Sequence, residues 1–259
     1  MNTRKGTLPS QAAHPGPAGT GLAFLCCLLL ALALFASRPA PVLALDAAQD
    51  IVQDAGRNIV SPAACVSMAD IEASLPNAPI VAGFDIDDTL LFSSPAFYYG
   101  AANREGPDGT GVYGPEPYKS QSFWDDMNSR LVQFCPPLET GRKLVEMHKR
   151  RGDAIVFITA RRGSVNETLT EQLARLFGLT NVKPTVFTDG GAKSEAMRQL
   201  GVSIFYGDGD GDVKSALDAG VRPIRTPRPA ISTAPDPIHP GAFGEQVLQT
   251  PWLPRVGCP

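Results

Sequence analysis

The sequence predicts an α/β fold built on a doubly wound parallel sheet. Short apolar runs that end in polar clusters recur along the chain, at 79–84, 153–159, 185–187 and 202–206. They lack the alternation of a half-exposed strand, which is typical of strands buried on both faces. Amphipathic helical patterns separate them, and this alternation predicts parallel strands covered by helices.

The first element is predicted to be an export signal. Residues 21–36 carry no charge, Arg4 and Lys5 precede them, and Val42-Leu43-Ala44 offers small residues for cleavage. This pattern predicts a signal peptide over 1–44 and a periplasmic or secreted protein with no membrane insertion after cleavage. The alternative is an uncleaved anchor, but the run is shorter than the roughly 20 residues that span a bilayer.

Residues 45–259 then form the predicted folded domain. Residues 47 to about 75 are expected to be helical and peripheral, with Ser67 and Asp70 as a capping box. The first core strand is followed by a small cap-like insert at about 92–137, which is rich in Gly, Pro and aromatic residues and has a helix around 122–134.

The second half continues the alternation. Its expected helices are 138–151, 166–177, 193–200 and 212–219. In the second of these, Leu169, Leu173 and Phe177 share one face, as a core-facing helix requires. The proline-rich tail, 226–259, is predicted to be irregular.

Composition excludes two classes of protein. Of 259 residues, 43% are hydrophobic, too many for a disordered chain. The 23 Lys and Arg residues against 26 Asp and Glu give a net charge of −3, which gives no reason to expect a nucleic-acid polymer as partner.

Three cysteines follow the signal peptide, namely Cys65, Cys135 and Cys258. An odd number allows at most one disulfide within the chain, and the sequence does not select the pair. Their spacings fit no zinc site.

The residues that carry chemistry follow the strands. Ligands of open α/β sheets bind beyond the carboxyl ends of the strands, so these residues are expected to converge there. They are Asp85, Asp87, Asp88 and Thr89 after the first strand, Thr159, Ala160 and Arg161 after the second, Lys193 at a helix start, and Asp208, Asp210 and Asp212 after the fourth.

Crowded carboxylates need a cation, and Mg²⁺ prefers oxygen ligands. We expect one Mg²⁺ per subunit, held by Asp85, the backbone carbonyl of Asp87 and Asp208, with Asp212 holding metal-bound water. The alternative of a calcium-binding EF-hand loop starting at Asp208 fails, because its sixth and twelfth positions are Val213 and Ala219.

The same residues suit phosphoryl transfer. Asp85 can attack phosphorus, and Asp87 can protonate the leaving oxygen and then deprotonate water. The Thr159 hydroxyl, the Ala160 N–H and Lys193 can hold the phosphoryl oxygens as charge develops.

Two segments, 84–95 (FDIDDTLLFSSP) and 205–212 (FYGDGDGD), carry a family resemblance, supported by 147–154 and 241–245. The chain resembles the class B non-specific acid phosphatases of the haloacid dehalogenase (HAD) superfamily from about residue 66 to 249. The resemblance implies a HAD-like Rossmannoid core and a Mg²⁺-dependent periplasmic homotetramer. It also implies hydrolysis of organic phosphomonoesters, nucleotides included, and phosphate transfer to alcohols.

The resemblance assigns roles by position. Asp85 is then the nucleophile and Asp87 the proton donor. Thr159, Ala160 and Lys193 lie at phosphate-binding positions, and Arg161 is counted among the substrate-binding residues. Phe97 and Trp124 match aromatic residues that line the leaving-group pocket.

The chain departs from the family pattern in a few places. Ala160 replaces a usual Gly, Gly209 and Gly211 replace Ser and Asn, Ala234 replaces a pocket Tyr, and Tyr118 occupies another pocket position. These changes leave the substrate preference open. A more selective nucleotidase and an exported, non-enzymatic metal-binding protein are the alternatives, but a metal site alone does not need Asp87.

Overall fold

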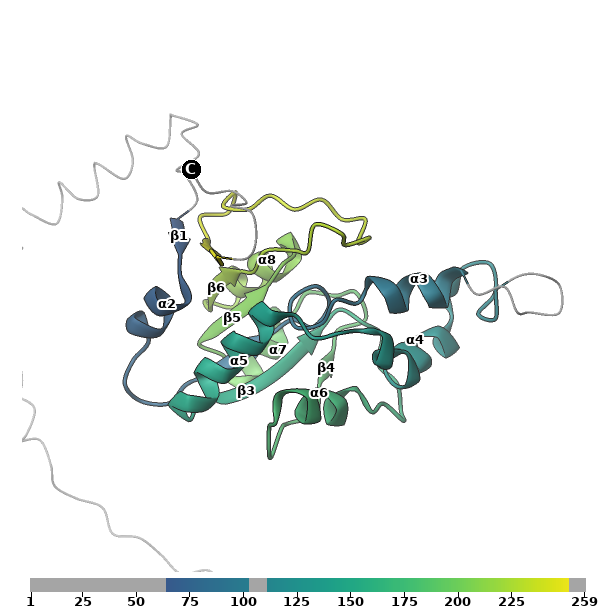
Figure 1. The fold of residues 1–259 in the computed structure, drawn as a ribbon, viewed down its shortest axis with the longest axis horizontal. Helices are drawn as coiled ribbons and strands as arrows, with labels where there is room; N and C mark the ends of the chain where they lie inside the picture. The colour runs from purple at the N-terminus through teal and green to yellow at the C-terminus, as the bar shows by residue number, and fades with distance from the viewer. Residues whose placement is uncertain (1–63, 103–110, 252–259) are drawn as a thin grey trace, which may run out of the picture. The chain divides into compact units, whose positions relative to one another are not determined.

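The computed structural model describes residues 64–102 and 111–251 (Figure 1). Seven strands there form one sheet in the order β1-β7-β6-β5-β2-β3-β4, and each neighbouring pair is parallel. The strands are β1 Ala64–Val66, β2 Val81–Phe84, β3 Ala154–Thr159, β4 Val186–Phe187, β5 Ile204–Gly207, β6 Arg222–Arg225 and β7 Gln246–Leu248. The predicted α/β fold with a parallel sheet is confirmed. The predicted signal peptide and Cys258 lie outside the described residues.

Helices cover both faces of this sheet. Along β3 the side chains alternate, so that Phe157 joins one core, with Leu144 and Leu173, while Val156 and Ile158 join the other, with Met197 and Ala216. The helices are α2 Met68–Ser74, α3 Ser94–Ala102, α4 Gln121–Met127, α5 Glu139–Arg151, α6 Leu169–Phe177, α7 Ser194–Leu200 and α8 Asp210–Asp218, with 3₁₀ turns η2 Pro117–Lys119 and η3 Arg130–Phe134. Among the described helices, none has the length and apolar character to cross a membrane.

Some predicted elements were wrong. Residues 64–66, expected to be helical, form β1, and the tail, expected to be irregular, contains β7. β6 was missed altogether. These strands are short and are held by pairing with partners far away in the chain, such as Ala64 with Gln246, so no local pattern marks them.

The predicted helix at 122–134 is in fact two elements. α4 ends at Met127, and η3 begins at Arg130, after Ser129, whose φ of −139° and ψ of −98° lie outside helical space. The capping box is confirmed, because the Ser67 hydroxyl accepts from Asp70 N–H and the Asp70 carboxylate accepts from Ser67 N–H.

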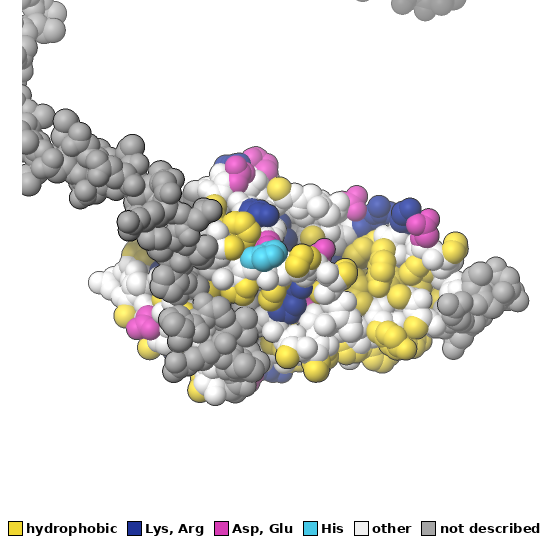
Figure 2. Space-filling view, turned by 90° about the horizontal axis from the view of Figure 1, so that it is seen from above, with side chains coloured by type: hydrophobic (Ala, Val, Ile, Leu, Met, Phe, Trp, Pro, Cys, Tyr) yellow, Lys and Arg dark blue, Asp and Glu magenta, His cyan; other side chains and the backbone are white. Residues whose placement is uncertain are grey.

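In the folded unit that the structure describes, α3 and α4 of the insert lie to one side of the sheet (Figure 1). Figure 2, seen from above, shows apolar side chains gathered on this side. Tyr98 is 71% exposed and Tyr118 52%, and the Tyr99 ring is tilted against that of the exposed Phe134, with ring centres 5.1 Å apart. The insert therefore presents aromatic side chains to solvent.

A buried polar network supports the sheet from α5. His148 Nδ1 is 2.7 Å from Asp153 Oδ2, and its Nε2 is 2.9 Å from the Tyr206 hydroxyl. The Tyr206 ring stacks on Phe84 with centres 4.8 Å apart. The network fixes Phe84 at the end of β2 and Tyr206 next to the end of β5, the two strands that precede the acidic motifs.

One disulfide pairing is excluded. Cys65 is disulfide-bonded, whereas Cys135 is a buried free thiol. These two cysteines are therefore not bonded to each other.

Candidate active site

The site begins where β2 and β5, neighbours in the middle of the sheet, both end. Asp85 follows β2 directly, and its N–H donates to the Tyr206 carbonyl at 2.9 Å. Asp208 follows β5 in the same way. Because the strands are parallel, both carboxylates reach the same edge, as the sequence predicts.

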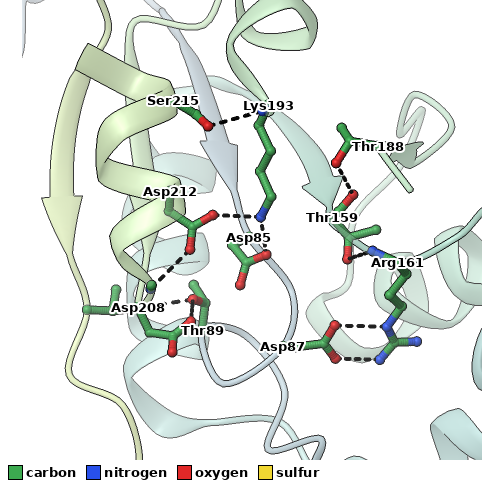
Figure 3. Close-up of polar contacts among 12 residues, drawn as sticks. Asp85, Asp87, Thr89, Thr159, Arg161, Thr188, Lys193, Asp208, Asp212 and Ser215 are labelled. Atoms are coloured by element: carbon green, nitrogen blue, oxygen red, sulfur yellow. Dashed lines mark hydrogen bonds and ion pairs between the residues drawn. The ribbon is translucent and has the colours of Figure 1, made fainter. Parts of the chain in front are cut away.

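Lys193 joins two of the carboxylates. Its Nζ donates to Asp85 Oδ1 and, at 2.7 Å, to Asp212 Oδ1, while its backbone N–H donates to Ser215 Oγ at 3.1 Å (Figure 3). Lys193 is 5% exposed. Burial lowers the pKa of Lys193, but Asp212 and Asp85 outweigh it and raise that pKa above its usual value. The ammonium group therefore stays charged.

Three carboxylates lie close enough to share a cation. Oxygens of Asp85, Asp208 and Asp212 lie within 4.8 Å of one another, and all three side chains are buried. Burial and the charge of Asp212 raise the pKa of Asp85 well above its usual value and that of Asp208 to about 6. The ionised forms of these carboxylates are therefore unfavourable unless a positive charge lies between them. Because all the donor atoms are oxygens, the site fits a hard divalent cation such as Mg²⁺. The Asp87 carbonyl as a ligand stays a prediction.

Asp87 is held by an arginine. Arg161 Nε donates to Asp87 Oδ2 at 2.9 Å, and Nη2 donates to Oδ1 at 2.6 Å. The third arm of the guanidinium, Nη1, donates to the Met127 carbonyl at the end of α4, at 2.6 Å. Burial raises the pKa of Asp87, but the charge and hydrogen bonds of Arg161 outweigh it, so that the pKa lies below its usual value.

The other predicted phosphate ligands lie at the end of β3. Thr159 is buried, and its hydroxyl accepts from Arg161 N–H at 3.2 Å, while its carbonyl accepts from Thr188 (Figure 3). Ala160 is exposed. These positions agree with a role for Thr159 and Ala160 beside Asp85, and that role stays a prediction.

The predicted pocket aromatics come together in the insert. Phe97 on α3 and Trp124 on α4 are partly buried, with ring centres 6.1 Å apart and edge to face. Tyr118 lies equally close to Phe97. The Arg161 guanidinium lies 5.9 Å from the Phe97 ring centre, so the aromatic cluster adjoins the Asp87 side of the site.

Sequence reasoning missed several contacts to Asp208. Thr89 Oγ1 donates to Oδ1 at 3.2 Å, and Arg228 Nε donates to Oδ2 at 2.5 Å. Arg225 donates to the Asp208 carbonyl at 2.9 Å. Thr89 could have been found, since it belongs to the DxDxT motif, but nothing local marks the two arginines.

Gly207 was also missed. A Cβ at this position would collide with the side chain of Asp212. Only glycine therefore lets α8 bring Asp212 against the end of β5. At Gly211, by contrast, an added Cβ would meet nothing within 4 Å, so its departure from the family pattern leaves the backbone undisturbed.

Comparison with known proteins agrees with this geometry. Residues 43–233 match the model of the family described as HAD superfamily, subfamily IIIB (acid phosphatase). The chain belongs to this family. A class B acid phosphatase of Salmonella arizonae is 40% identical over 198 residues, covering 73% of this chain and 80% of that protein. One from Edwardsiella ictaluri is 41% identical over 191 residues, covering 71% and 77%.

As a relative of the class B acid phosphatases, the chain is a phosphoric monoester hydrolase acting on small phosphomonoesters. The matched range includes every predicted site residue, from Asp85 to Asp212. It ends before β7, so the part of the tail that completes the sheet lies beyond the family's match.

Proposed function

We propose that this chain is a Mg²⁺-dependent acid phosphatase that hydrolyses organic phosphomonoesters, nucleotides included, through a phosphoryl group on Asp85, and that transfers phosphate to alcohols. The observation that carries the proposal is the position of Asp85, between the Lys193 ammonium group and the carboxylates of Asp208 and Asp212. Asp87 lies two residues after Asp85 in the chain, and the proposed reaction needs an acid there to protonate the leaving oxygen. The aromatic cluster around Phe97 supports binding of a nucleobase or aryl leaving group.

In the first step, an Asp85 carboxylate oxygen bonds to phosphorus while the bond from phosphorus to the ester oxygen breaks. Asp87 gives its proton to that leaving oxygen. Lys193 and Thr159 hold phosphoryl oxygens. When bound, Mg²⁺ supplies charge neutralisation that lets the anionic Asp85 approach an anionic phosphate.

In the second step, Asp87 takes a proton from water, whose oxygen bonds to phosphorus, and the bond from phosphorus to Asp85 breaks. Inorganic phosphate leaves, and Asp85 and Asp87 return to their starting states. An alcohol in place of water would receive the phosphoryl group, which is the proposed transfer reaction.

Metal dependence is the direct test. Hydrolysis of a generic aryl phosphate is expected with Mg²⁺ and is expected to stop in excess EDTA, returning when Mg²⁺ is restored. A rate unchanged by EDTA would contradict the proposed metal. No hydrolysis under any of these conditions would favour the exported metal-binding protein over the enzyme.

The pH dependence follows from Asp87. It must be protonated to donate first, and because Arg161 lowers its pKa, the protonated fraction falls as the pH rises. Activity is therefore expected to decline from acid towards neutral pH. In Arg161→Gln the pKa of Asp87 rises, so the declining limb of kcat/KM should move to higher pH by about one unit or more.

The matched control is the neighbouring Arg162→Gln, which removes a pair with the exposed Asp189 and should leave the limb in place. Arg161→Lys keeps the positive charge and should move the declining limb of kcat/KM less than Arg161→Gln does. A limb that moves to lower pH in Arg161→Gln would contradict the role of Asp87 as the acid.

We propose further that the protein is exported, as a periplasmic or secreted enzyme, and forms homotetramers. The charge-free run at 21–36 supports export. The exposed aromatic side chains of the insert support association between copies. Fractionation of cells and light scattering of the purified protein test these two proposals.

A further inference from the structure

Arg228, in the tail after β6, acts on Asp208 directly. Its Nε lies 2.5 Å from Asp208 Oδ2, and its Nη1 donates to the Asp236 carbonyl at 2.7 Å. The Arg228 side chain is 13% exposed. The other oxygen of Asp208 accepts from Thr89. Arg228 is therefore a direct counter-ion of Asp208.

A second buried carboxylate lies beside this pair. Asp88 Oδ2 accepts from the Ser232 hydroxyl, whereas Asp88 Oδ1 is buried and has no hydrogen-bond partner within residues 64–102 and 111–251. Burial raises the pKa of Asp88, and the charge of Arg228 acts to lower it. The positive charge of the Arg228 guanidinium therefore acts on two buried carboxylates, those of Asp88 and Asp208.

The neighbouring cations are already engaged. Lys193 bridges Asp85 and Asp212, and Arg225 pairs with Glu245 and Asp210. Of these cations, Arg228 is the one whose charge acts on Asp88, and Ser232, four residues along the same tail, already donates to Asp88.

We propose that Arg228 is a positioning residue that exchanges Asp208 for Asp88 when a divalent cation binds, so that metal occupancy sets the position of residues 228–236. This inference rests on the metal site of the proposed function. A divalent cation bound by Asp208 would add a second positive charge next to the Arg228 guanidinium on the same carboxylate, and the two positive charges repel. The partnerless Asp88 Oδ1 is the acceptor that receives the displaced guanidinium.

The test is a double-mutant cycle with Mg²⁺ titrated calorimetrically into EDTA-treated, dialysed protein. The variants are Arg228→Gln, Asp88→Asn and both together. Asn suits position 88, because φ there is 57° and Asn tolerates the left-handed region. The control is Arg222→Gln, at the far end of β6, where the guanidinium binds Gln246.

Arg228→Gln removes the competing charge and should bind Mg²⁺ about tenfold more tightly, while melting at a lower temperature in EDTA because Asp208 loses its counter-ion. Asp88→Asn removes the second acceptor and should weaken Mg²⁺ binding about tenfold. With Gln at 228 the same Asp88 change should matter less than about threefold, and Arg222→Gln should match the wild type.

Equal effects of Asp88→Asn in the two backgrounds would overturn the exchange, as would Mg²⁺ binding that weakens in Arg228→Gln. Failure of the wild-type protein to bind Mg²⁺ is a different result, which would overturn the proposed metal site itself. Arg228→Lys keeps the charge, and its Mg²⁺ affinity should stay within about threefold of the wild type.

Discussion

Asp85→Asn is expected to lower kcat for an aryl phosphate by about 10⁴-fold or more, because the amide oxygen cannot form the phosphoryl intermediate. The substitution keeps the shape of the side chain and can keep its contact with Lys193. It also removes one of three mutually repelling carboxylates, so the folded protein should be at least as stable as the wild type. The measurement is steady-state hydrolysis with Mg²⁺.

The control for Asp85→Asn is Asp210→Asn, on the same acidic loops but paired with His239 and Arg225 rather than with Lys193. It should retain most of the activity. An Asp85→Asn rate within tenfold of the wild type, in protein whose circular dichroism is unchanged, would rule out Asp85 as the nucleophile.

Lys193→Met should affect both stability and activity. It leaves the buried carboxylates of Asp85 and Asp212 without their cation, and breaking such a pair costs about 3–5 kcal/mol of unfolding free energy. It also removes a group proposed to hold the phosphoryl oxygens, so kcat should fall by about 10²–10³-fold. Urea unfolding in EDTA and steady-state kinetics measure the two effects.

The same substitution at Lys183, an exposed lysine, provides the control and should change neither quantity appreciably. Mg²⁺ should restore part of the stability lost in Lys193→Met, because a divalent cation replaces the missing positive charge. Unfolding of Lys193→Met in EDTA within 1 kcal/mol of the wild type, on the scale of an ordinary surface substitution, would contradict the central role of Lys193.

The core strands and the residues that follow them could be predicted from the amino-acid pattern alone. An apolar run such as 153–159 is long enough to be read as a buried strand, and a parallel sheet brings its strand ends to one edge. The convergence of Asp85, Asp208 and Lys193 at that edge therefore follows from their positions after the strands. The lengths of α5 and α7 followed from their apolar periodicity.

The surroundings of those residues depend instead on long-range contacts in the folded chain. β1 and β7 are three residues each and exist because they pair with each other, and no window of sequence contains both. The attachment of Arg161 to Asp87 and of Arg228 to Asp208 likewise depends on segments that meet only in the folded sheet. The apolar pattern of one segment reflects which of its side chains are buried, so it can be recognised from that segment alone. An ion pair between distant residues depends on which segments the fold brings into contact, and no single segment records this. For this reason the reactive groups could be named from the sequence, and the arginines that hold them could not.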